Sequence, residues 1–373
     1  MAEKKTTAKT APAPAVETVE NPVNKMIDGL VEKAQAALKE FLTLDQEQID
    51  HIVHEMALAG LDKHQELARM AVEETGRGVY EDKVIKNMFA TEYIWHDIKN
   101  EKTVGILDEN EMEGYVEVAE PVGVICGVTP TTNPTSTAIF KCLLALKTRN
   151  AIIISPHPRA KESTIAAAKV VREAAEAAGA PAGLIRWIEQ PSLELTNELM
   201  RDADIILATG GPGMVKAAYS SGKPALGVGA GNTPAIIDSS ADIKLAVMSI
   251  LHSKTFDNGM ICASEQAVIV DQEIAKDFES YMKANNCYFL NKEETEQLAK
   301  YMFPDPHKGV FAPVVGKSAN WIAEQAGLKV PEKTKILIAP ISSPDENHPL
   351  AKEKLSPVLA YFVVNSKQQG FDY

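Results

Sequence analysis

The sequence predicts an α/β protein of two domains whose sheets are rich in parallel strands, preceded by a helical N-terminal segment. Three observations predict this class. Apolar residues between 26 and 41 follow helical spacing, apolar β-branched segments alternate with alanine-rich ones from about residue 115, and the alternation begins again after Gly231. Apolar strands separated by helices indicate a parallel sheet covered on both faces, and such sheets bind ligands at the carboxyl ends of their strands.

Length and composition narrow the class of protein. A chain of 373 residues exceeds what one hydrophobic core usually organises, and its net charge of -13 argues against nucleic-acid binding. No apolar run is long enough to span a membrane, and the N-terminus lacks an apolar secretion signal. The four cysteines form no CxxC pair, which favours a reducing compartment. We therefore expect a cytoplasmic protein.

The first third of the sequence is expected to support the domains that follow. Residues 1–22 contain almost no large apolar side chains and are predicted to be a disordered leader. Residues 23–114 are predicted to form a helical segment that packs on the cofactor domain. His51 and His54 share a helix face, but no pattern such as HExxH accompanies them. We interpret both as solvent-facing or capping residues and expect no metal site.

Residues 115–233 are predicted to form a dinucleotide-binding domain. Its expected strands are nearly continuous apolar segments, and alanine-rich helices separate them. We expect strands at 122–126, 151–154, 184–188, 205–208 and 225–228, and helices at about 134–147, 160–179, 193–201 and 213–221.

Residues 234–373 are predicted to form a second α/β domain that carries a reactive thiol. We expect a strand at 235–237, a helix near 241–254, a polar loop and a strand at about 265–270. The pattern reaches Tyr373 without a clear terminating element, which suggests that the chain ends inside this domain.

Cys262 is the candidate nucleophile. It ends the polar sequence Phe-Asp-Asn-Gly-Met-Ile-Cys and an apolar strand follows, an arrangement that leaves a thiolate reachable while the scaffold holds it still. A buried structural cysteine is the alternative interpretation. Cys126 and Cys142 fit that alternative because apolar residues surround them in the sequence. Cys287 follows two asparagines, so we expect it in a turn and partly exposed.

Two segments at predicted strand ends have residues suited to ligand binding. Residues 209–213 include Gly210, Gly211 and Gly213, which let backbone amides approach a phosphate at a helix N-terminus. A tight turn needs glycine as well, and the segment lacks the G-x-G-x-x-G fingerprint. Residues 130–136 include Asn133, whose amide suits a developing oxyanion, although simple helix capping explains this segment too.

Five motifs in this order resemble the aldehyde dehydrogenase superfamily: Pro-x-x-Asn-Pro, Ser-Pro-His-Pro-Arg, Ala-Thr-Gly-Gly, Gly-Val-Gly-Ala-Gly-Asn-Thr-Pro and Phe-Asp-Asn-Gly-x-x-Cys. The resemblance covers residues 24–373. It extends to the CoA-acylating branch, and within it to the aldehyde dehydrogenase part of bacterial bifunctional aldehyde-alcohol dehydrogenases. It implies an aldehyde dehydrogenase-like fold and the NAD-dependent conversion of acetaldehyde, or another short aldehyde, to acetyl-CoA. The reaction would be reversible and would run reductively in fermentation.

The resemblance assigns roles residue by residue. Cys262 takes the place of the nucleophile and would form a thiohemiacetal and then a thioester, while Asn133 and the amide of Cys262 match the oxyanion hole. Glu353 falls where the family has a glutamate that holds the nicotinamide ribose, although a surface charge before a turn is the alternative. The positions that match the dinucleotide site include Pro130, Thr131, Thr132, Gly210, Gly211 and Gly213.

Departures from the family pattern are informative. Val228 stands where hydrolytic members have a glutamate that activates water, so the acyl-enzyme is expected to await coenzyme A. Ser155 and Pro158 replace a lysine and a glutamate that grip the adenine ribose. NADP is therefore not excluded beside NAD, with His157 or Arg159 as alternative contacts to the ribose or phosphates. Relatives continue with a Gly-Gly-x-Gly-His segment and an iron-dependent alcohol dehydrogenase domain, so iron belongs to sequence absent here.

The resemblance also implies a homo-oligomer, filamentous in full-length relatives. Three other functions stay open at this point. The same fold reduces acyl phosphates in some enzymes, a hydrolytic dehydrogenase would need an unrecognised base, and an assembly module would have an inactive site in this truncated form.

Overall fold

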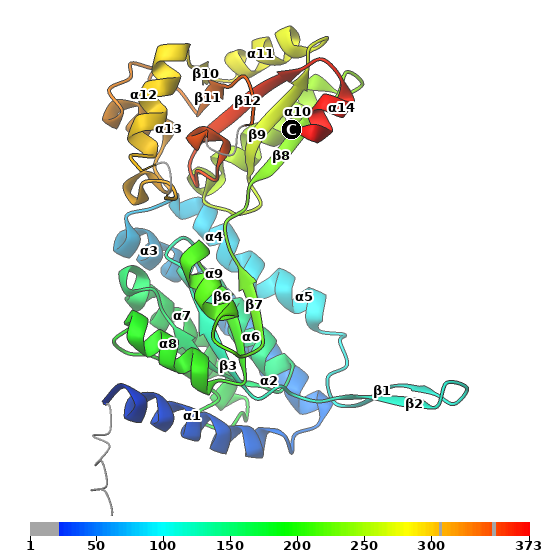
Figure 1. Ribbon diagram of the computed structural model, residues 1–373. Helices are drawn as coiled ribbons and strands as arrows, with labels where there is room; N and C mark the ends of the chain where they lie inside the picture. Colours follow the sequence, from blue (N-terminus) through cyan, green and yellow to red (C-terminus); the bar gives the residue numbers. More distant parts are fainter. Residues whose placement is uncertain (1–21, 306–307, 345–347) are drawn as a thin grey trace, which may run out of the picture.

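Two five-stranded sheets organise the chain, one in each of the two lobes that Figure 1 shows one above the other. The computed structural model describes residues 22–305, 308–344 and 348–373. Pro22 begins the first helix, and the rest of the predicted leader lies outside the described residues. Every strand pair within the two sheets is parallel, so the predicted α/β class with parallel sheets is confirmed.

Helices and strands alternate along most of the chain. The helical elements are α1 (Pro22–Phe41), α2 (Gln46–Asp62), α3 (His64–Thr75), α4 (Tyr80–Met88), the π-helix η1 (Phe89–Tyr93), α5 (Ile94–Ile98), α6 (Pro134–Lys147), η2 (Pro158–Ala160), α7 (Lys161–Ala177), α8 (Leu193–Asp202), α9 (Pro212–Tyr219), α10 (Ile243–Thr255), η3 (Phe256–Gly259), α11 (Ala275–Ala284), α12 (Lys292–Met302), η4 (Ala312–Val314), α13 (Ala319–Gln325), η5 (Pro349–Ala351) and α14 (Lys367–Asp372). The strands are β1 (Gly105–Asn110), β2 (Tyr115–Ala119), β3 (Val124–Val128), β4 (Ala151–Ser155), β5 (Ile185–Trp187), β6 (Ile205–Thr209), β7 (Ala225–Val228), β8 (Thr233–Ile237), β9 (Glu265–Asp271), β10 (Cys287–Phe289), β11 (Ile336–Pro340) and β12 (Val358–Val364).

The first sheet has the strand order β5-β4-β3-β6-β7. β3 and β4 are buried at every residue, as expected of strands covered on both faces. The connections through α6 and α7 lead the chain from β3 out to β5, and α8 then returns it to β6 on the other side of β3. A parallel sheet binds ligands where the strand order reverses in this way, so the ends of β3 and β6 are the expected site.

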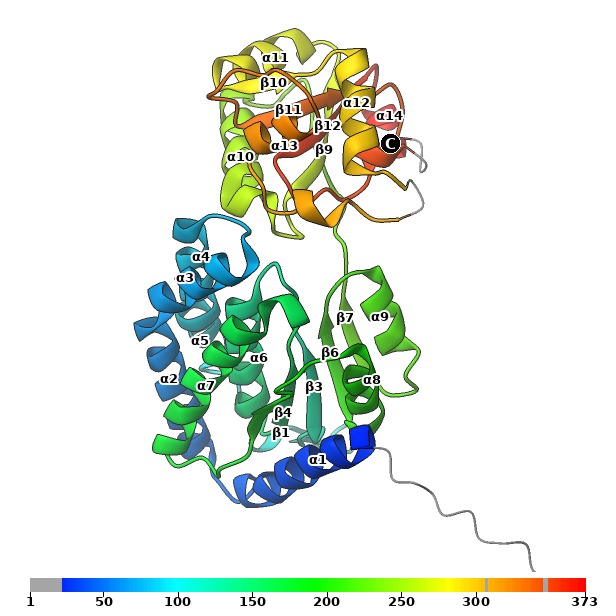
Figure 2. The same ribbon diagram turned by 90° about the vertical axis from the view of Figure 1, so that its left-hand side faces the viewer.

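The N-terminal helices complete the core of this lobe. α1 contacts β3, β4 and β5, whereas α2 contacts α6 and α7. Figure 2 shows α2 and α7 on one side of the sheet and α8 on the other. Ile27, Phe41 and Ile49 are fully buried and belong to one continuous cluster with the strands. The helical segment therefore stabilises the sheet that carries one half of the pocket.

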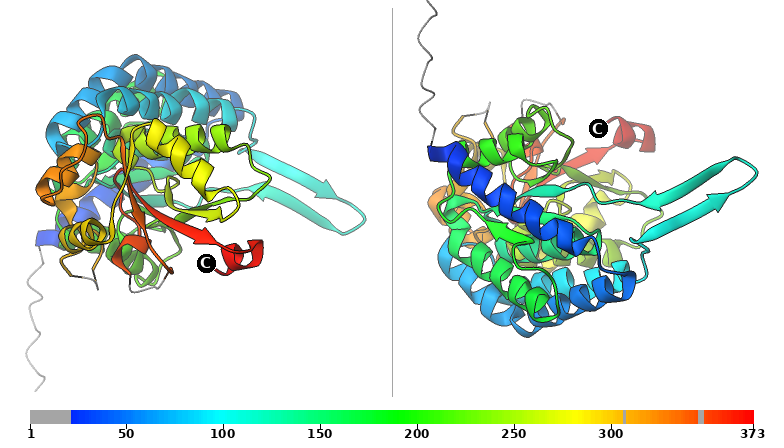
Figure 3. Two further views of the ribbon diagram at one scale, coloured as in Figure 1. Left: turned by 90° about the horizontal axis from the view of Figure 1, so that it is seen from above. Right: turned by 90° about the horizontal axis from the view of Figure 1, so that it is seen from below.

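Strands β1 and β2 form an antiparallel hairpin that extends away from both lobes (Figure 3). Neither strand was predicted, and β1 corrects our expectation that residues 23–114 are helical throughout. Ile106, Val116 and Val118 stay exposed beside charged residues on the same strands, so the apolar pattern that marks buried strands is missing here.

The second sheet has the strand order β10-β11-β12-β9-β8. α10 and α11 contribute to the apolar cluster on one face, and α12 and α13 to a cluster on the other. Cys287 begins β10 and lies in the first of these clusters with 5% of its surface exposed. Our expectation that it is partly exposed is therefore wrong, because the turn at residues 285–286 ends one residue before the buried strand.

The lobes meet at the turn between α3 and α4 as well as at the linker between β7 and β8. The Gly78 amide donates to the Gly316 carbonyl at 3.0 Å, and Arg77 Nη2 donates to the Ala312 carbonyl at 3.0 Å. No helix in the described part of the chain is long and apolar enough to span a membrane.

Candidate active site

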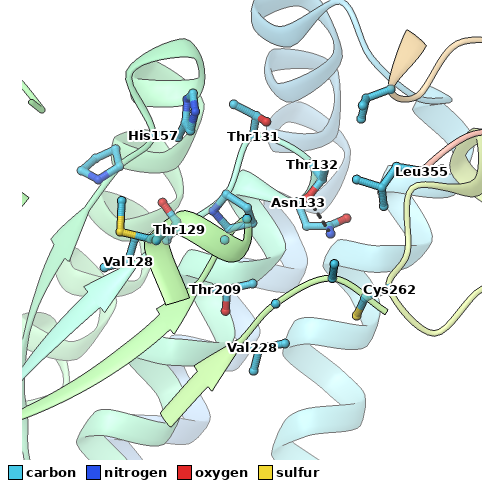
Figure 4. Close-up of a pocket in the computed structure, with 18 of the residues that line it drawn as sticks. Val128, Thr129, Thr131, Thr132, Asn133, His157, Thr209, Val228, Cys262 and Leu355 are labelled. Atoms are coloured by element: carbon cyan, nitrogen blue, oxygen red, sulfur yellow. Dashed lines mark hydrogen bonds between the residues drawn. The ribbon is translucent and has the colours of Figure 1, made fainter. Parts of the chain in front are cut away.

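A pocket of about 470 Å³ lies between the lobes. The first lobe lines it with residues at the ends of β3, β4, β6 and β7, and the second lobe with residues that include Met260, Cys262, Glu353 and Leu355. Figure 4 shows Cys262 with Asn133, Val228 and Leu355 around it, and His157 toward the other end of the pocket. A thiol from one lobe thus faces the ligand-binding strand ends of the other.

The loop that carries Cys262 has an unusual backbone. Asp257 and Asn258 are left-handed with φ of 49° and 53°, and Gly259 follows with φ of 71°. Asp and Asn tolerate this region better than most side chains, and glycine adopts it without steric cost. The Met260 amide donates to the Asp257 carbonyl at 3.2 Å, which closes the turn and leaves Cys262 exposed to the pocket.

The linker after β7 approaches the thiol loop closely. A Cβ atom at Gly231 would lie 2.0 Å from the carbonyl oxygen of Cys262, a backbone atom that cannot turn away. Only glycine fits this position without displacing the loop. The Gly231 amide also donates to Glu353 Oε1 at 3.0 Å, so the linker contacts two of the predicted site residues.

Asn133 precedes α6, and Pro134 takes the first helical position, where a proline loses no hydrogen bond. The Asn133 side chain does not cap the helix. Its Oδ1 instead accepts a hydrogen bond from Lys86 Nζ at 2.7 Å, and its Nδ2 donates to Thr132 Oγ1 at 3.3 Å. Because a cation occupies the carbonyl end of the amide, its NH2 end is the one available to stabilise a negative oxygen.

A buried ion cluster supports both Asn133 and the thiol loop. Asp257 Oδ2 accepts from Lys83 Nζ at 3.0 Å and from Lys86 Nζ at 2.6 Å, and Asp257 is fully buried. Lys86 Nζ also donates to the Met260 carbonyl at 2.9 Å. Burial lowers the pKa of Lys86 to about 8, while the charge of Asp257 opposes that shift. One carboxylate thereby fixes both lysines, and Lys86 joins Asn133 to the thiol loop.

The far end of the pocket has the features of a nucleotide site. Gly210 and Gly211 follow β6 and precede α9, and both line the pocket. The Ser155 hydroxyl shares a hydrogen bond of 2.8 Å with Thr196 Oγ1, and His157 stands exposed above it. Burial, followed by the charges of Arg159 and Arg77, lowers the pKa of His157. The end of the pocket next to His157 is therefore electropositive.

Glu353 is the only carboxylate among the described residues that line the pocket. Burial raises its pKa, and the hydrogen bond from Gly231 and the charges of Lys254 and Lys354 act against that rise. Lys254 and Lys354 lie below it, fully buried. Lys254 Nζ donates to Gln266 Oε1 at 3.3 Å, and Lys354 Nζ donates to the carbonyls of Leu350 and Lys352.

The structure brings ten of the twelve predicted site residues to one pocket. These are Cys262, Asn133, Pro130, Thr131, Thr132, Ser155, His157, Gly210, Gly211 and Glu353. Arg159 lines an adjoining cavity with Thr131, and Gly213 lies inside α9 away from both. No group of three or more possible metal ligands occurs among the described residues. His51 is exposed, whereas His54 is half-buried and its ring centroid lies 5.2 Å from that of Trp95.

Sequence reasoning missed Arg77, Lys83, Lys86 and the role of Asp257 as their anchor. The sequence contains only a weak indication that these residues belong to the site. Lys83 and Lys86 are three residues apart on one helix face, which normally indicates a solvated surface. Only the contact between α4 and η3, which are distant in the sequence, shows that this face is buried.

Comparisons with known proteins show which family the chain resembles. The family model described as "Aldehyde dehydrogenase family" matches residues 2–287. The bifunctional aldehyde-alcohol dehydrogenase AdhE of Escherichia coli K12 is 55% identical over 338 residues, which are 90% of this chain and 38% of that protein. This chain thus spans little more than a third of that relative.

Two solved structures resemble the chain over nearly its whole length. An acetylating aldehyde dehydrogenase from Geobacillus thermoglucosidasius is 47% identical with a TM-score of 0.90, covering 94% of this chain and 77% of that one. A Rhodopseudomonas palustris propionaldehyde dehydrogenase, with bound CoA and an acylated cysteine, is 31% identical with a TM-score of 0.81, covering 93% and 79%.

Proposed function

Because the chain belongs to the aldehyde dehydrogenase family, we propose that its pocket oxidises acetaldehyde with a nicotinamide dinucleotide and transfers the acetyl group from Cys262 to coenzyme A. We propose further that this is the acetylating aldehyde dehydrogenase part of a bifunctional aldehyde-alcohol dehydrogenase. The similarity to AdhE over 90% of the chain supports both proposals.

The residues present fit a dinucleotide. The glycine turn before α9 leaves open space, since no atom lies within 4 Å of a Cβ built at Gly211. Backbone amides there suit a diphosphate, and Glu353 suits a ribose hydroxyl near the thiol. When bound, the dinucleotide supplies the hydride acceptor. The pantetheine arm of CoA needs a path to the same thiol, and the small residues Gly229 and Ala230, which line the pocket, leave room for it.

Cys262 acts first as a nucleophile. Its thiolate forms a bond to the aldehyde carbon, and the carbonyl electron pair moves to the oxygen, giving a thiohemiacetal. The NH2 of Asn133 and the amide of Cys262 stabilise that negative oxygen. In the described part of the chain, the Cys262 amide has no hydrogen-bond partner, so it is available for this role. Loss of a hydride from the thiohemiacetal then leaves a thioester on Cys262.

The thioester is then discharged to a thiol and not to water. Val228 lines the pocket without a basic group, and Glu353 is engaged with the Gly231 amide. The deprotonated thiol of CoA attacks the acyl carbon, and the electron pair of the broken C–S bond returns to Cys262. The sum is acetaldehyde, NAD+ and CoA giving acetyl-CoA, NADH and a proton. The observation that carries this proposal is an exposed thiol beside Asn133 in a pocket that has valine, and no carboxylate, at position 228.

The finer assignments are NAD as the dinucleotide and a homo-oligomer as the assembled state. The family resemblance supports NAD, although Pro158 provides no carboxylate to repel the 2′-phosphate of NADP. The exposed apolar residues of the β1–β2 hairpin, Ile106, Val116 and Val118, support assembly.

The proposed reaction is tested by measuring acetyl-CoA and free acetate after incubation with acetaldehyde and NAD+, with and without CoA. We expect acetyl-CoA with CoA present and acetate formation about a hundredfold slower without it, which is the usual contribution of a missing general base. Val228→Glu is the matched variant and should increase acetate release. Acetate release without CoA that is as fast as acetyl-CoA formation with CoA would refute the proposal, and NADH oxidation by acetyl phosphate would favour the acyl-phosphate alternative.

A further inference from the structure

A second cavity of about 380 Å³ adjoins the active-site pocket. Three residues, Arg77, Thr131 and Pro158, line both spaces, and the second cavity is completed by Glu74, Thr75 and Arg159. Thr131 lies at the His157 end of the pocket, away from Cys262 (Figure 4). A ligand that reaches the thiol through the pocket would therefore place its opposite end beside this cavity.

Two guanidinium groups line this cavity without an acidic partner. Arg77 Nη2 donates to the Ala312 carbonyl, and among the described residues neither arginine forms an ion pair. The cavity's one carboxylate, Glu74, is already engaged. Its two oxygens accept from the backbone amides of Glu162 and Ser163 at 2.8 Å each. Partial burial, followed by the charge of Arg159, lowers the pKa of Arg77, which indicates that the two charges lie near each other.

This arrangement suits one ligand chemistry. Guanidinium groups bind phosphates through two parallel hydrogen bonds, and a pair of them matches a dianionic phosphomonoester better than a singly charged diester. The diphosphate of a bound nucleotide is expected at Gly210 and Gly211, which line the pocket but not the second cavity. An anion bound beside the arginines would therefore be a different phosphate of the same ligand.

We propose that Arg77 and Arg159 form a subsite for the phosphomonoester on the adenosine ribose of a nucleotide ligand. Coenzyme A carries such a group on the 3′ oxygen, and NADP carries one on the 2′ oxygen. The proposal rests on the proposed function, because that function brings an adenosine nucleotide into the pocket. In this proposal Arg77, at the junction of the lobes, binds the phosphomonoester. This binding does not depend on catalysis at Cys262.

The test measures binding by isothermal titration calorimetry, so it does not depend on activity. The protein is titrated with CoA and with dephospho-CoA, and separately with NADP+ and with NAD+. The same four titrations are repeated with Arg77→Gln/Arg159→Gln. Arg201→Gln is the matched control, because Arg201 is an exposed arginine on α8 that pairs with Glu198 away from the cavity.

We expect CoA to bind about tenfold more tightly than dephospho-CoA, since one additional charge-assisted contact is typically worth a factor of this size. The double variant should lose that difference and keep its affinity for dephospho-CoA, whereas the control should keep both. If the double variant loses only the difference in affinity between NADP+ and NAD+, the subsite is supported and its ligand is the 2′-phosphate of NADP. Unchanged ratios for both pairs would overturn the proposal, and the product assay above would still decide the proposed function separately.

Discussion

Two pairs of buried lysines flank the thiol loop, and they are stabilised in different ways. Lys83 and Lys86 share the carboxylate of Asp257, which is fully buried, and they contact the loop and the amide of Asn133. Lys254 and Lys354 lie below Glu353 and donate to carbonyl and amide oxygens. No carboxylate in the described part of the chain forms an ion pair with the second pair.

The two pairs differ in how much positive charge they keep at neutral pH. Desolvation lowers the pKa of Lys86 to about 8 even beside Asp257, and that of Lys254, which has no such partner, to about 7. Lys86 therefore remains mostly protonated at neutral pH and holds the oxyanion side of the pocket by charge. Lys254 is partly neutral there, and burial also lowers the pKa of Lys354, so the second pair places less positive charge beside Glu353.

The largest effect is expected for Asp257→Asn. The amide keeps the shape and the left-handed backbone but removes the anion that two buried lysines share. We expect the free energy of unfolding to fall by about 3–5 kcal/mol, the usual cost of removing one partner of a buried ion pair. Urea denaturation measures it. A loss below about 1 kcal/mol would show that the cluster is not held by charge.

The second effect tests how closely the loop is held. Gly231→Ala would place a Cβ atom 2.0 Å from the Cys262 carbonyl oxygen and displace the thiol loop. We expect kcat to fall about a hundredfold, because displacements of about 1 Å in an active site have effects of that size. Gly29→Ala is the control, since Gly29 lies in α1, does not line the pocket, and has no atom within 4 Å of a Cβ built there. Equal losses in both variants would contradict the argument.

The third effect separates positioning from folding. Lys86→Met removes the donor that holds Asn133 Oδ1, while Lys83 remains to neutralise Asp257. We expect kcat to fall about tenfold with little change in the KM for acetaldehyde, which is less than the loss of an oxyanion donor itself causes. Asn133→Ala sets that upper limit. If Lys86→Met changes KM alone, Lys86 has no part in orienting the amide.

The smallest effect is a pH dependence of the free energy of unfolding that arises from Lys254, a member of the second lysine pair. Burial lowers the pKa of Lys254 from its ordinary value of 10.5 to about 7 in the folded protein. Between these two pH values the unfolded chain therefore binds more protons than the folded one. Burial of the charged Lys254 side chain therefore destabilises the folded protein most below pH 7. This destabilisation decreases as the pH rises from 7 toward 10.5. Lys254→Met should be about 1 kcal/mol more stable than the original protein at pH 6. This advantage should shrink steadily in denaturation experiments up to pH 10, and a constant difference would contradict the assignment.

The sequence predicted the first sheet and the pocket lining well because local patterns encode them. β3 and β4 are apolar at nearly every position, and the residues that follow them are confined by the strand ends to one edge of the sheet. The thiol loop is encoded by its own Asp, Asn and Gly residues. The hairpin, the elements after residue 271 and the buried lysines were not predicted, since they depend on contacts between segments far apart in the sequence. Lys86 and Asp257 are separated by 171 positions.

The account depends most on a thioester at Cys262 that water does not remove. Mass spectrometry of the intact protein after incubation with acetyl-CoA tests this directly, followed by peptide mapping and by chasing the label with buffer or with fresh CoA. We predict one acetyl group, located on Cys262, that persists in buffer and is lost on addition of CoA. Absence of the label, or its loss in buffer as fast as with CoA, would contradict the account.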